Sequence, residues 1–394
     1  MRLLTLLTLS GTLFAQEVKL PREMIPLVET AHAAPPEFAA DALLRVVESG
    51  KVSDKNTRRQ LIQDAFGLGG SAQLRAPMNA AAGLGPDTRA ASLAKAYQLK
   101  LDAMSLQIRA VNAMLALDKP AAREMFSAIA KPALDALPCE PSLAYDPSDF
   151  YRTLGAIARA TFTPADRKNE DHVRFLLDYV GQAASQPEVA AIRSILPSAG
   201  LTSDQLQAIE ARLQNTAPGA NTCQEAKSAK NEYWQSDAAK QIMQRASELR
   251  IRNGAMLSEA DRTSSQWQEQ LVDLLKTLAD WNAGQEKSEA DYYHQKSTVY
   301  EALIELTPPG PERDKLLDAF AGFIGNSSLQ SQSPAEWFVP AKALLERVRN
   351  TNTGEPAKVL AAFEASGNAA LAVYAALERV FGSQAPSWVT SSKG

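Results

Sequence analysis

The most informative pattern along the chain is the spacing of its hydrophobic residues. Between residues 88 and 117, two apolar stripes run side by side at intervals of three and four residues, which predicts one long helix covered on two sides. Between residues 259 and 282, a single apolar seam of the same spacing runs from Trp267 to Trp281 and predicts a helix with one buried face. No stretch alternates convincingly as a strand would. The pattern therefore predicts an all-α protein.

Helix start signals divide the chain into many segments. Thr163 before Pro164, Thr202 with Gln205, and Ser258 with Asp261 have the spacing of helix caps. We expect an irregular helical array or solenoid-like bundle of about 12 to 15 helices. A true repeat stays open, because the likeness of residues 343–348 to residues 375–380 uses only common helix formers. The expected helices span residues 36–49, 54–66, 88–117, 120–131, 148–161, 164–183, 187–196, 203–215, 223–252, 259–282, 286–306, 311–324, 334–350, 355–365 and 368–381.

Residues 1–15 have the pattern of a cleaved secretory signal peptide. Arg2 precedes an uncharged apolar stretch that ends at Phe14, and Ala15 is a small residue at the expected cleavage point. This stretch is too short to span the hydrocarbon core of a bilayer, and no later stretch is long enough. We therefore expect a mature chain from about Gln16, without a transmembrane anchor, in the periplasm or outside the cell.

The two cysteines bear on domain organisation. Cys139 and Cys223 both fall in expected loops, and an oxidising compartment favours a disulfide between them, with two buried inert thiols as the alternative. All five tryptophans follow residue 220, which suggests an N-terminal helical lobe over residues 16–216 and a C-terminal helical lobe over residues 217–394. Because the disulfide would join these lobes, one continuous unit is the other interpretation.

Charge and composition argue against several classes of function. The 41 basic and 45 acidic residues leave a net charge of −4, without the basic excess that nucleic acid requires. The glycines at residues 67–70 match no nucleotide-binding fingerprint, and we expect no cofactor. The three histidines, His32, His172 and His294, lie far apart in a chain without a CxxC motif, so no metal site is indicated.

His294 is the most interesting candidate for catalysis. Asp291 precedes it by three residues and Thr298 follows it by four, so an acid, an imidazole and a hydroxyl would share one helix face. A nucleophile on a regular helix, however, lacks the sharp turn and the backbone donors that stabilise an oxyanion. The favoured interpretation of this face is a solvated or capping cluster.

A second histidine and a pair of tyrosines are further candidate site residues. His172 follows Glu170 and Asp171 and could be a base tuned by acids, although a buried structural histidine is the stronger interpretation. Tyr292 and Tyr293 could contact a sugar or a peptide, because adjacent residues cannot both face one narrow seam. Core packing is the alternative for the aromatic cluster to which they belong.

The leading functional hypothesis is an exported helical protein with a binding or scaffolding role and a protein or cell-envelope partner. It rests on long amphipathic helices and on the lack of a catalytic signature in the sequence. The alternative is a glycan-acting hydrolase or lyase on an α/α toroid, with a pair of Asp or Glu residues brought together only by the fold. A concave pocket with converging acids would favour the enzyme.

Overall fold

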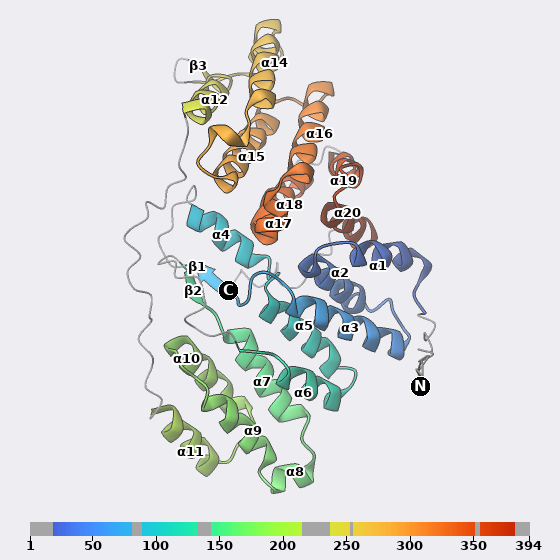
Figure 1. Cartoon of the computed structure of the whole chain (residues 1–394), viewed down its shortest axis with the longest axis vertical. Helices are drawn as coiled ribbons and strands as arrows, with labels where there is room; N and C mark the ends of the chain where they lie inside the picture. The colour runs from blue at the N-terminus through green and yellow to red at the C-terminus, as the bar shows by residue number, and fades with distance from the viewer. Residues whose placement is uncertain are drawn as a thin grey trace, which may run out of the picture.

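The computed structural model describes residues 19–80, 89–131, 143–214, 237–252, 255–350 and 355–382, and these are mostly helical (Figure 1). The prediction of an all-α protein is confirmed. The predicted signal peptide, Cys139 and Cys223 lie outside the described residues. The helices in the first half are α1 Ile25–His32, α2 Pro36–Glu48, α3 Lys55–Gly70, α4 Arg89–Gln98, α5 Ala103–Leu115, α6 Lys119–Ser127, α7 Ser148–Ala160, α8 Pro164–Lys168, α9 Asp171–Val180, α10 Gln186–Ile195 and α11 Ser203–Gln214.

The second half continues with helices of similar length. Two short antiparallel ladders, which the sequence did not predict, complete the described structure: β1 (Met78–Ala80) with β2 (Leu143–Tyr145), and β3 (Ile251–Arg252) with β4 (Ala255–Met256). The helices are α12 Asp237–Glu248, α13 Glu259–Arg262, α14 Ser265–Asp280, α15 Glu289–Leu306, α16 Pro311–Asn326, α17 Leu329–Gln332, α18 Pro334–Asn350, α19 Glu355–Ala365 and α20 Ala369–Phe381.

The predicted caps form in the structure. Thr163 and Asp166 make a reciprocal capping box before α8, and Thr202 and Gln205 exchange hydrogen bonds in the same way before α11. The Ser258 Oγ accepts from the Asp261 backbone N–H, and the Asp261 carboxylate accepts from the Ser258 N–H. Each of these caps satisfies backbone donors that the first helical turn leaves without a partner.

The long helix expected over residues 88–117 is a wrong prediction, because the chain breaks it into α4 and α5. Lys100 has a φ of 53°, a left-handed conformation that a continuous helix cannot contain. The carboxylate of Asp102 then accepts a hydrogen bond from the Ser105 N–H at 2.9 Å and caps α5. In the same way, Glu170, with a φ of 58°, divides the helix expected over residues 164–183 into α8 and α9.

Helix α3 is longer than expected, because it continues through the glycines that suggested a loop. A Cβ atom at Gly69 would lie 2.9 Å from the Cβ of Leu106 on α5. This distance is too short for two side chains, so the glycine allows the backbone of α3 to approach α5 closely. The cost of glycine in a helix is therefore offset by packing between the two helices.

The described helices form one elongated arrangement in which each helix packs on its neighbours (Figure 1). From α11 the contacts pass through α9, α7, α5, α3 and α2, and from α14 they pass through α12, α15, α16, α19 and α20. The two series meet where α1 and α2 pack against α20, and α4 packs against α18. One continuous cluster of buried side chains reaches from Met24 to Leu377.

Aromatic side chains fill part of the junction between the two series. The ring of Phe38 on α2 lies 5.9 Å from the ring of Trp337 and 5.0 Å from the ring of Phe338, both on α18. The indole of Trp337 donates to the carbonyl oxygen of Ile324 at 2.8 Å. Residues distant in the sequence are thus held by edge-on ring contacts and by a satisfied indole donor.

Candidate functional site

Helix α15 carries an uncommon density of buried polar side chains. It packs against α12, α16, α17 and α18, so that more than one of its faces is covered. The Ser288 Oγ caps its first turn by accepting from the Asp291 N–H at 3.1 Å. Buried charged and polar groups are uncommon unless they are paired, so each one on this helix requires a partner or a role. The buried polar residues of α15 are Asp291, His294, Gln295, Lys296 and Ser297.

His294 lies between a hydroxyl and a carboxylate that come from two other helices. Its Nδ1 is 3.3 Å from the Ser92 Oγ on α4, and its Nε2 is 3.2 Å from Oε1 of Glu336 on α18. The second carboxylate oxygen of Glu336 accepts from the Ser333 Oγ at 3.0 Å. Because a carboxylate only accepts hydrogen bonds, it favours the tautomer with the proton on Nε2, which leaves the lone pair of Nδ1 directed at Ser92.

The predicted partners of His294 on its own helix have other roles. The Asp291 carboxylate accepts from the Ser288 Oγ at 2.7 Å, at the start of α15. The hydroxyl of Thr298 donates to the backbone carbonyl of His294 at 2.9 Å and not to its ring. The helix-face spacing therefore placed Asp291 and Thr298 near His294, whereas the acid and the hydroxyl beside its ring are Glu336 and Ser92. No local signal in the sequence could have found these two residues.

A second acid and a tyrosine lie close to this site. Tyr97 on α4 is buried, and burial together with the charges of Asp102 and Glu336 raises the pKa of its hydroxyl to about 12. Asp102 is fully buried, and burial raises the pKa of its carboxyl to about 6. Two carboxyl groups from different helices thus influence one buried phenol.

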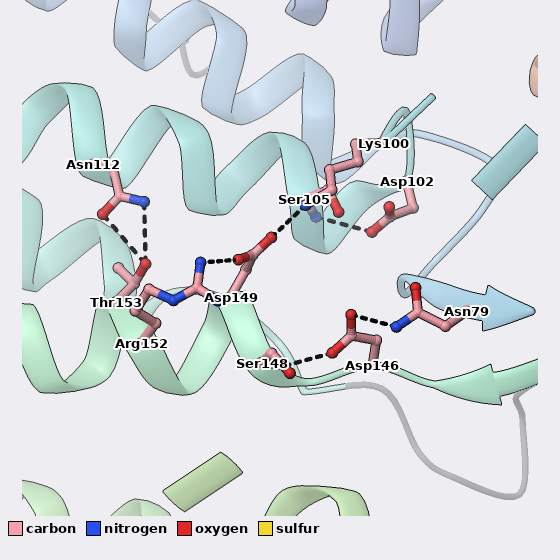
Figure 2. A network of polar contacts seen from close by, with 10 residues as sticks. All are labelled: Asn79, Lys100, Asp102, Ser105, Asn112, Asp146, Ser148, Asp149, Arg152 and Thr153. Atoms are coloured by element: carbon pink, nitrogen blue, oxygen red, sulfur yellow. Dashed lines mark hydrogen bonds and ion pairs between the residues drawn. The ribbon is translucent and has the colours of Figure 1, made fainter. Parts of the chain in front are cut away.

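Figure 2 shows how Asp102 is placed at the start of α5. Lys100, in its left-handed conformation, directs its ammonium to the Asp149 carboxylate on α7 at 2.7 Å, and Arg152 binds the other oxygen of Asp149 at 2.6 Å. Deeper along the same pair of helices, the hydroxyl of Thr153 and the side-chain amide of Asn112 exchange hydrogen bonds of 3.1 and 3.2 Å. This network holds the break between α4 and α5.

Lys296 is buried, and its described hydrogen-bond partners include no carboxylate. Its ammonium donates to the carbonyl oxygen of Trp281 at 2.7 Å and to the hydroxyl of Tyr292 at 2.9 Å. It also lies 5.1 Å from the centre of the Tyr292 ring and 5.3 Å from that of Phe323. Among the ion pairs of the described residues, none involves Lys296. Burial lowers the pKa of this lysine to about 8.

The two tyrosines predicted to bind a ligand occupy different positions. The Tyr292 hydroxyl donates to the Trp281 carbonyl at 2.9 Å, and its ring remains partly exposed. Tyr293 is fully buried, donates to the carbonyl of Trp337 at 2.5 Å and stacks on Phe323. A ligand role for the pair stays a prediction, and the contacts of Tyr293 are those of a side chain packed in the core.

His172 belongs to α9, which lies in the lower part of Figure 1, whereas His294 belongs to α15, which lies in the upper part. It is 3% exposed, and its ring centre lies 6.3 Å from that of Phe162. Burial, followed by the nearby charge of Arg167, lowers the pKa of its imidazole. The described residues contain no group of three His, Cys, Asp or Glu side chains that could hold a metal ion.

The opposite end of the molecule has a groove that sequence reasoning missed. We call α12, the β3–β4 ladder and α14 the α12–α14 arm. Its groove has a volume of about 670 Å³ and is lined by exposed acids together with the buried side chains of Leu249 and Leu274. The Arg245 guanidinium binds the Asp273 carboxylate and donates to Thr277, which ties α12 to α14. The lining residues are Arg245, Glu248, Leu249, Ile251, Gln266, Glu269, Gln270, Asp273 and Leu274.

The comparisons with known proteins add no relative. No protein-family model matches the chain, and no curated protein and no solved structure matches it significantly. Within the part of the chain that the structure describes, no helix is both long and apolar enough to cross a bilayer.

Proposed function

We propose that the protein is exported and binds a protein partner through the α12–α14 arm, with the remaining helices as a solenoid-like support. The observation that carries this proposal is the place of its exposed apolar side chains. In the described residues, four large hydrophobic side chains are exposed, and three of them, Ile251, Met256 and Val272, belong to this arm. Ile251 and Met256 are directly paired across the β3–β4 ladder, and Ile251 lines the groove. Exposed apolar residues that lie together on a surface are typical of interaction sites.

The shape of the arm supports the same proposal. Leu249, Ile251 and Leu274 give the groove apolar contacts, while its glutamates and glutamines provide a polar rim. An apolar centre within a polar rim is the usual composition of a protein interface. A volume of about 670 Å³ is enough for a few side chains of a partner.

The arrangement of the helices gives less support to a glycan-acting toroid. A toroid closes its helices into a ring around a central cleft, whereas the described helices extend along one axis, with α11 and α14 towards its opposite ends (Figure 1). The acids nearest His294 are buried, with Glu336 at 6% and Asp102 at 0% exposure. Substrate-binding carboxylates need access to a pocket.

Export is part of this proposal and is supported by the signal-like residues 1–15. The periplasm or the extracellular space would be the compartment in which the partner is met. The same compartment would allow Cys139 and Cys223 to form a disulfide between the two halves of the chain. Mass spectrometry of the secreted chain under non-reducing conditions tests both, because cleavage after Ala15 and the loss of two hydrogens change the mass independently.

Site-specific photo-crosslinking tests the binding surface. A photoreactive phenylalanine analogue at Met256, the ladder partner of Ile251, should give a discrete adduct with a partner in the native compartment, and adding Ile251→Glu should reduce this adduct by about tenfold or more. Ile25 on α1 is the matched control position, because it is 41% exposed, as is Ile251. The proposal fails if the analogue gives the same adducts at both positions or if Ile251→Glu has no effect.

A further inference from the structure

We propose that Ser92 is an activated serine that accepts an acyl group from a small ester, with His294 as its general base and Glu336 as the acid that orients the base. This activity is independent of partner binding at the α12–α14 arm. The hydroxyl, the imidazole and the carboxylate lie in a row across three helices, α4, α15 and α18.

The order of the groups is the order that nucleophilic catalysis requires. A serine hydroxyl is a weak nucleophile until a neighbouring base takes its proton, and that base must be held in the correct tautomer by a third group. Here the Ser92 Oγ is 3.3 Å from Nδ1 of His294, and Nε2 of the same ring is 3.2 Å from Glu336. The 3.3 Å contact is loose, as is common before a substrate binds.

The surroundings hold the base and the acid rigidly. The side chains of His294 and Glu336 are only 8% and 7% exposed, and Ser333 binds the second oxygen of Glu336. Low exposure strengthens the hydrogen bond between the imidazole and the carboxylate. Ser92 itself is only partly buried, so it is the most exposed member of the row.

The position of Ser92 also answers the objection to a nucleophile on a regular helix. Ser92 is the fourth residue of α4, a helix of 10 residues that begins at Arg89. A side chain in this first turn leans towards the N-terminal end of its helix, and this end favours a negative charge. An oxyanion that forms at Ser92 would therefore gain electrostatic stabilisation that a residue in mid-helix, such as Thr298, cannot offer.

The reaction balances with an ester and water alone. Ser92 Oγ adds to the acyl carbonyl carbon while its proton passes to Nδ1 of His294, and the resulting oxyanion collapses with loss of the alcohol, which takes that proton. Water then adds to the acyl-serine, again giving a proton to His294, and the carboxylic acid leaves as Oγ regains its hydrogen. Because Ser92 is partly buried, short acyl groups are the substrates that fit.

A fluorophosphonate reagent tests the proposal on the purified full chain. Attack by Ser92 would release fluoride and leave one phosphonyl group, which peptide mass spectrometry would place on Ser92. We expect the group to be lost in Ser92→Ala, about 100-fold slower to form in His294→Gln and about tenfold slower in Glu336→Gln. Ser203 is the internal control, because it begins α11 and is exposed but has no histidine beside it among its described contacts.

Three results would overturn the proposal. The first is no phosphonyl group on Ser92, the second is labelling of Ser92 no faster than of Ser203 in the same molecule, and the third is an equal rate in folded His294→Gln. The comparison with Ser203 needs no variant, so it remains decisive even if His294→Gln unfolds. A purely structural bridge between α4, α15 and α18 would lower the melting temperature of Ser92→Ala without any labelling of Ser92 in the wild type.

Discussion

Lys131, which follows α6, and Lys296 on α15 both donate a hydrogen bond to a tyrosine, yet their electrostatic surroundings are opposite. Lys131 forms an ion pair with Glu188 on α10 at 2.7 Å and donates to the Tyr151 hydroxyl at 3.2 Å. Lys296 donates to the Tyr292 hydroxyl and to a backbone carbonyl, and it pairs with no carboxylate of the described residues. One site is a neutralised pair, and the other is a buried cation among dipoles and rings.

The carboxylate accounts for the difference. Burial alone would raise the pKa of Glu188, but hydrogen bonds from Lys131, the Ala184 N–H and Tyr151 hold it below its ordinary value. Without such a partner, burial dominates at Lys296 and lowers its pKa. The comparison shows that one acid decides the state of a lysine in contact with a tyrosine. With a carboxylate partner the lysine forms a structural ion pair, and without one burial lowers its pKa, so that it loses its proton more readily.

The largest expected effect comes from removing that acid. Glu188→Gln should lower the free energy of unfolding by about 3 kcal/mol, because it leaves Lys131 without a counter-charge in a largely buried site. Urea unfolding at pH 7 measures the change. Glu364→Gln is the matched control, since Glu364 pairs with Arg379 on the surface. A loss for Glu188→Gln no larger than for the control would contradict the idea of a neutralised pair.

The next largest losses of stability should come from removing the hydroxyls of the two tyrosines. Tyr151 donates to the Glu188 carboxylate at 3.1 Å, so Tyr151→Phe should cost about 2 kcal/mol of stability. The Tyr292 hydroxyl donates to a neutral carbonyl, so Tyr292→Phe should cost about 1 kcal/mol. Thermal or urea unfolding of both variants, measured side by side, decides the order. The reverse order would mean that the hydroxyl matters more to the unpaired lysine.

Lys296→Met sharpens the comparison through its dependence on pH. The folded chain holds the pKa of Lys296 near 8, below the ordinary value of 10.5, so the unfolded chain binds more protons between these values. Wild-type stability should therefore gain about 1 kcal/mol from this group as the pH rises from 8 to 9. Lys296→Met should be more stable than wild type at pH 7, with an advantage that shrinks over this range. Unfolding curves at several pH values test this, and a constant difference would refute it.

The smallest effect should come from a lysine that stays in water. Lys358 on α19 binds the Asp314 carboxylate on α16 at 2.6 Å, but its side chain is 54% exposed. Lys358→Met should change the free energy of unfolding by less than about 0.5 kcal/mol, because water and salt screen such a pair. The same unfolding experiment measures it, and a change as large as that of Glu188→Gln would show that exposure is not the deciding variable.

Local physics made much of the fold predictable. Helix caps such as those of Thr163 and Thr202 depend on residues three positions apart, and both form as predicted. The breaks at Lys100 and Glu170 could not be predicted, because neither residue has a preference for the left-handed region that would mark a break. The persistence of α3 through Gly69 depends on its approach to Leu106, a contact between elements distant in the sequence.

The candidate site depends even more than the fold on contacts between elements that are distant in the sequence. The spacing on α15 drew attention to His294, but Ser92 lies 202 residues before it and Glu336 lies 42 residues after it. The spacing of residues along one helix describes that helix alone. It could place Asp291 and Thr298 on the same helix face as His294, but it could not show which side chains of other helices reach that face. Only the packing of α4 and α18 supplies them.

The contact of α1 and α2 with α20 affects the order in which the helices can pack during synthesis. These are the earliest and the latest helices that the structure describes, and the ammonium of Lys51, just after α2, lies 5.4 Å from the ring of Phe381 at the end of α20. During synthesis, the first helices must wait for residues 369–381 before their last partner exists. The middle of the array is therefore completed only when the chain has emerged as far as residue 381, so the faces of α1 and α2 that contact α20 stay open until then.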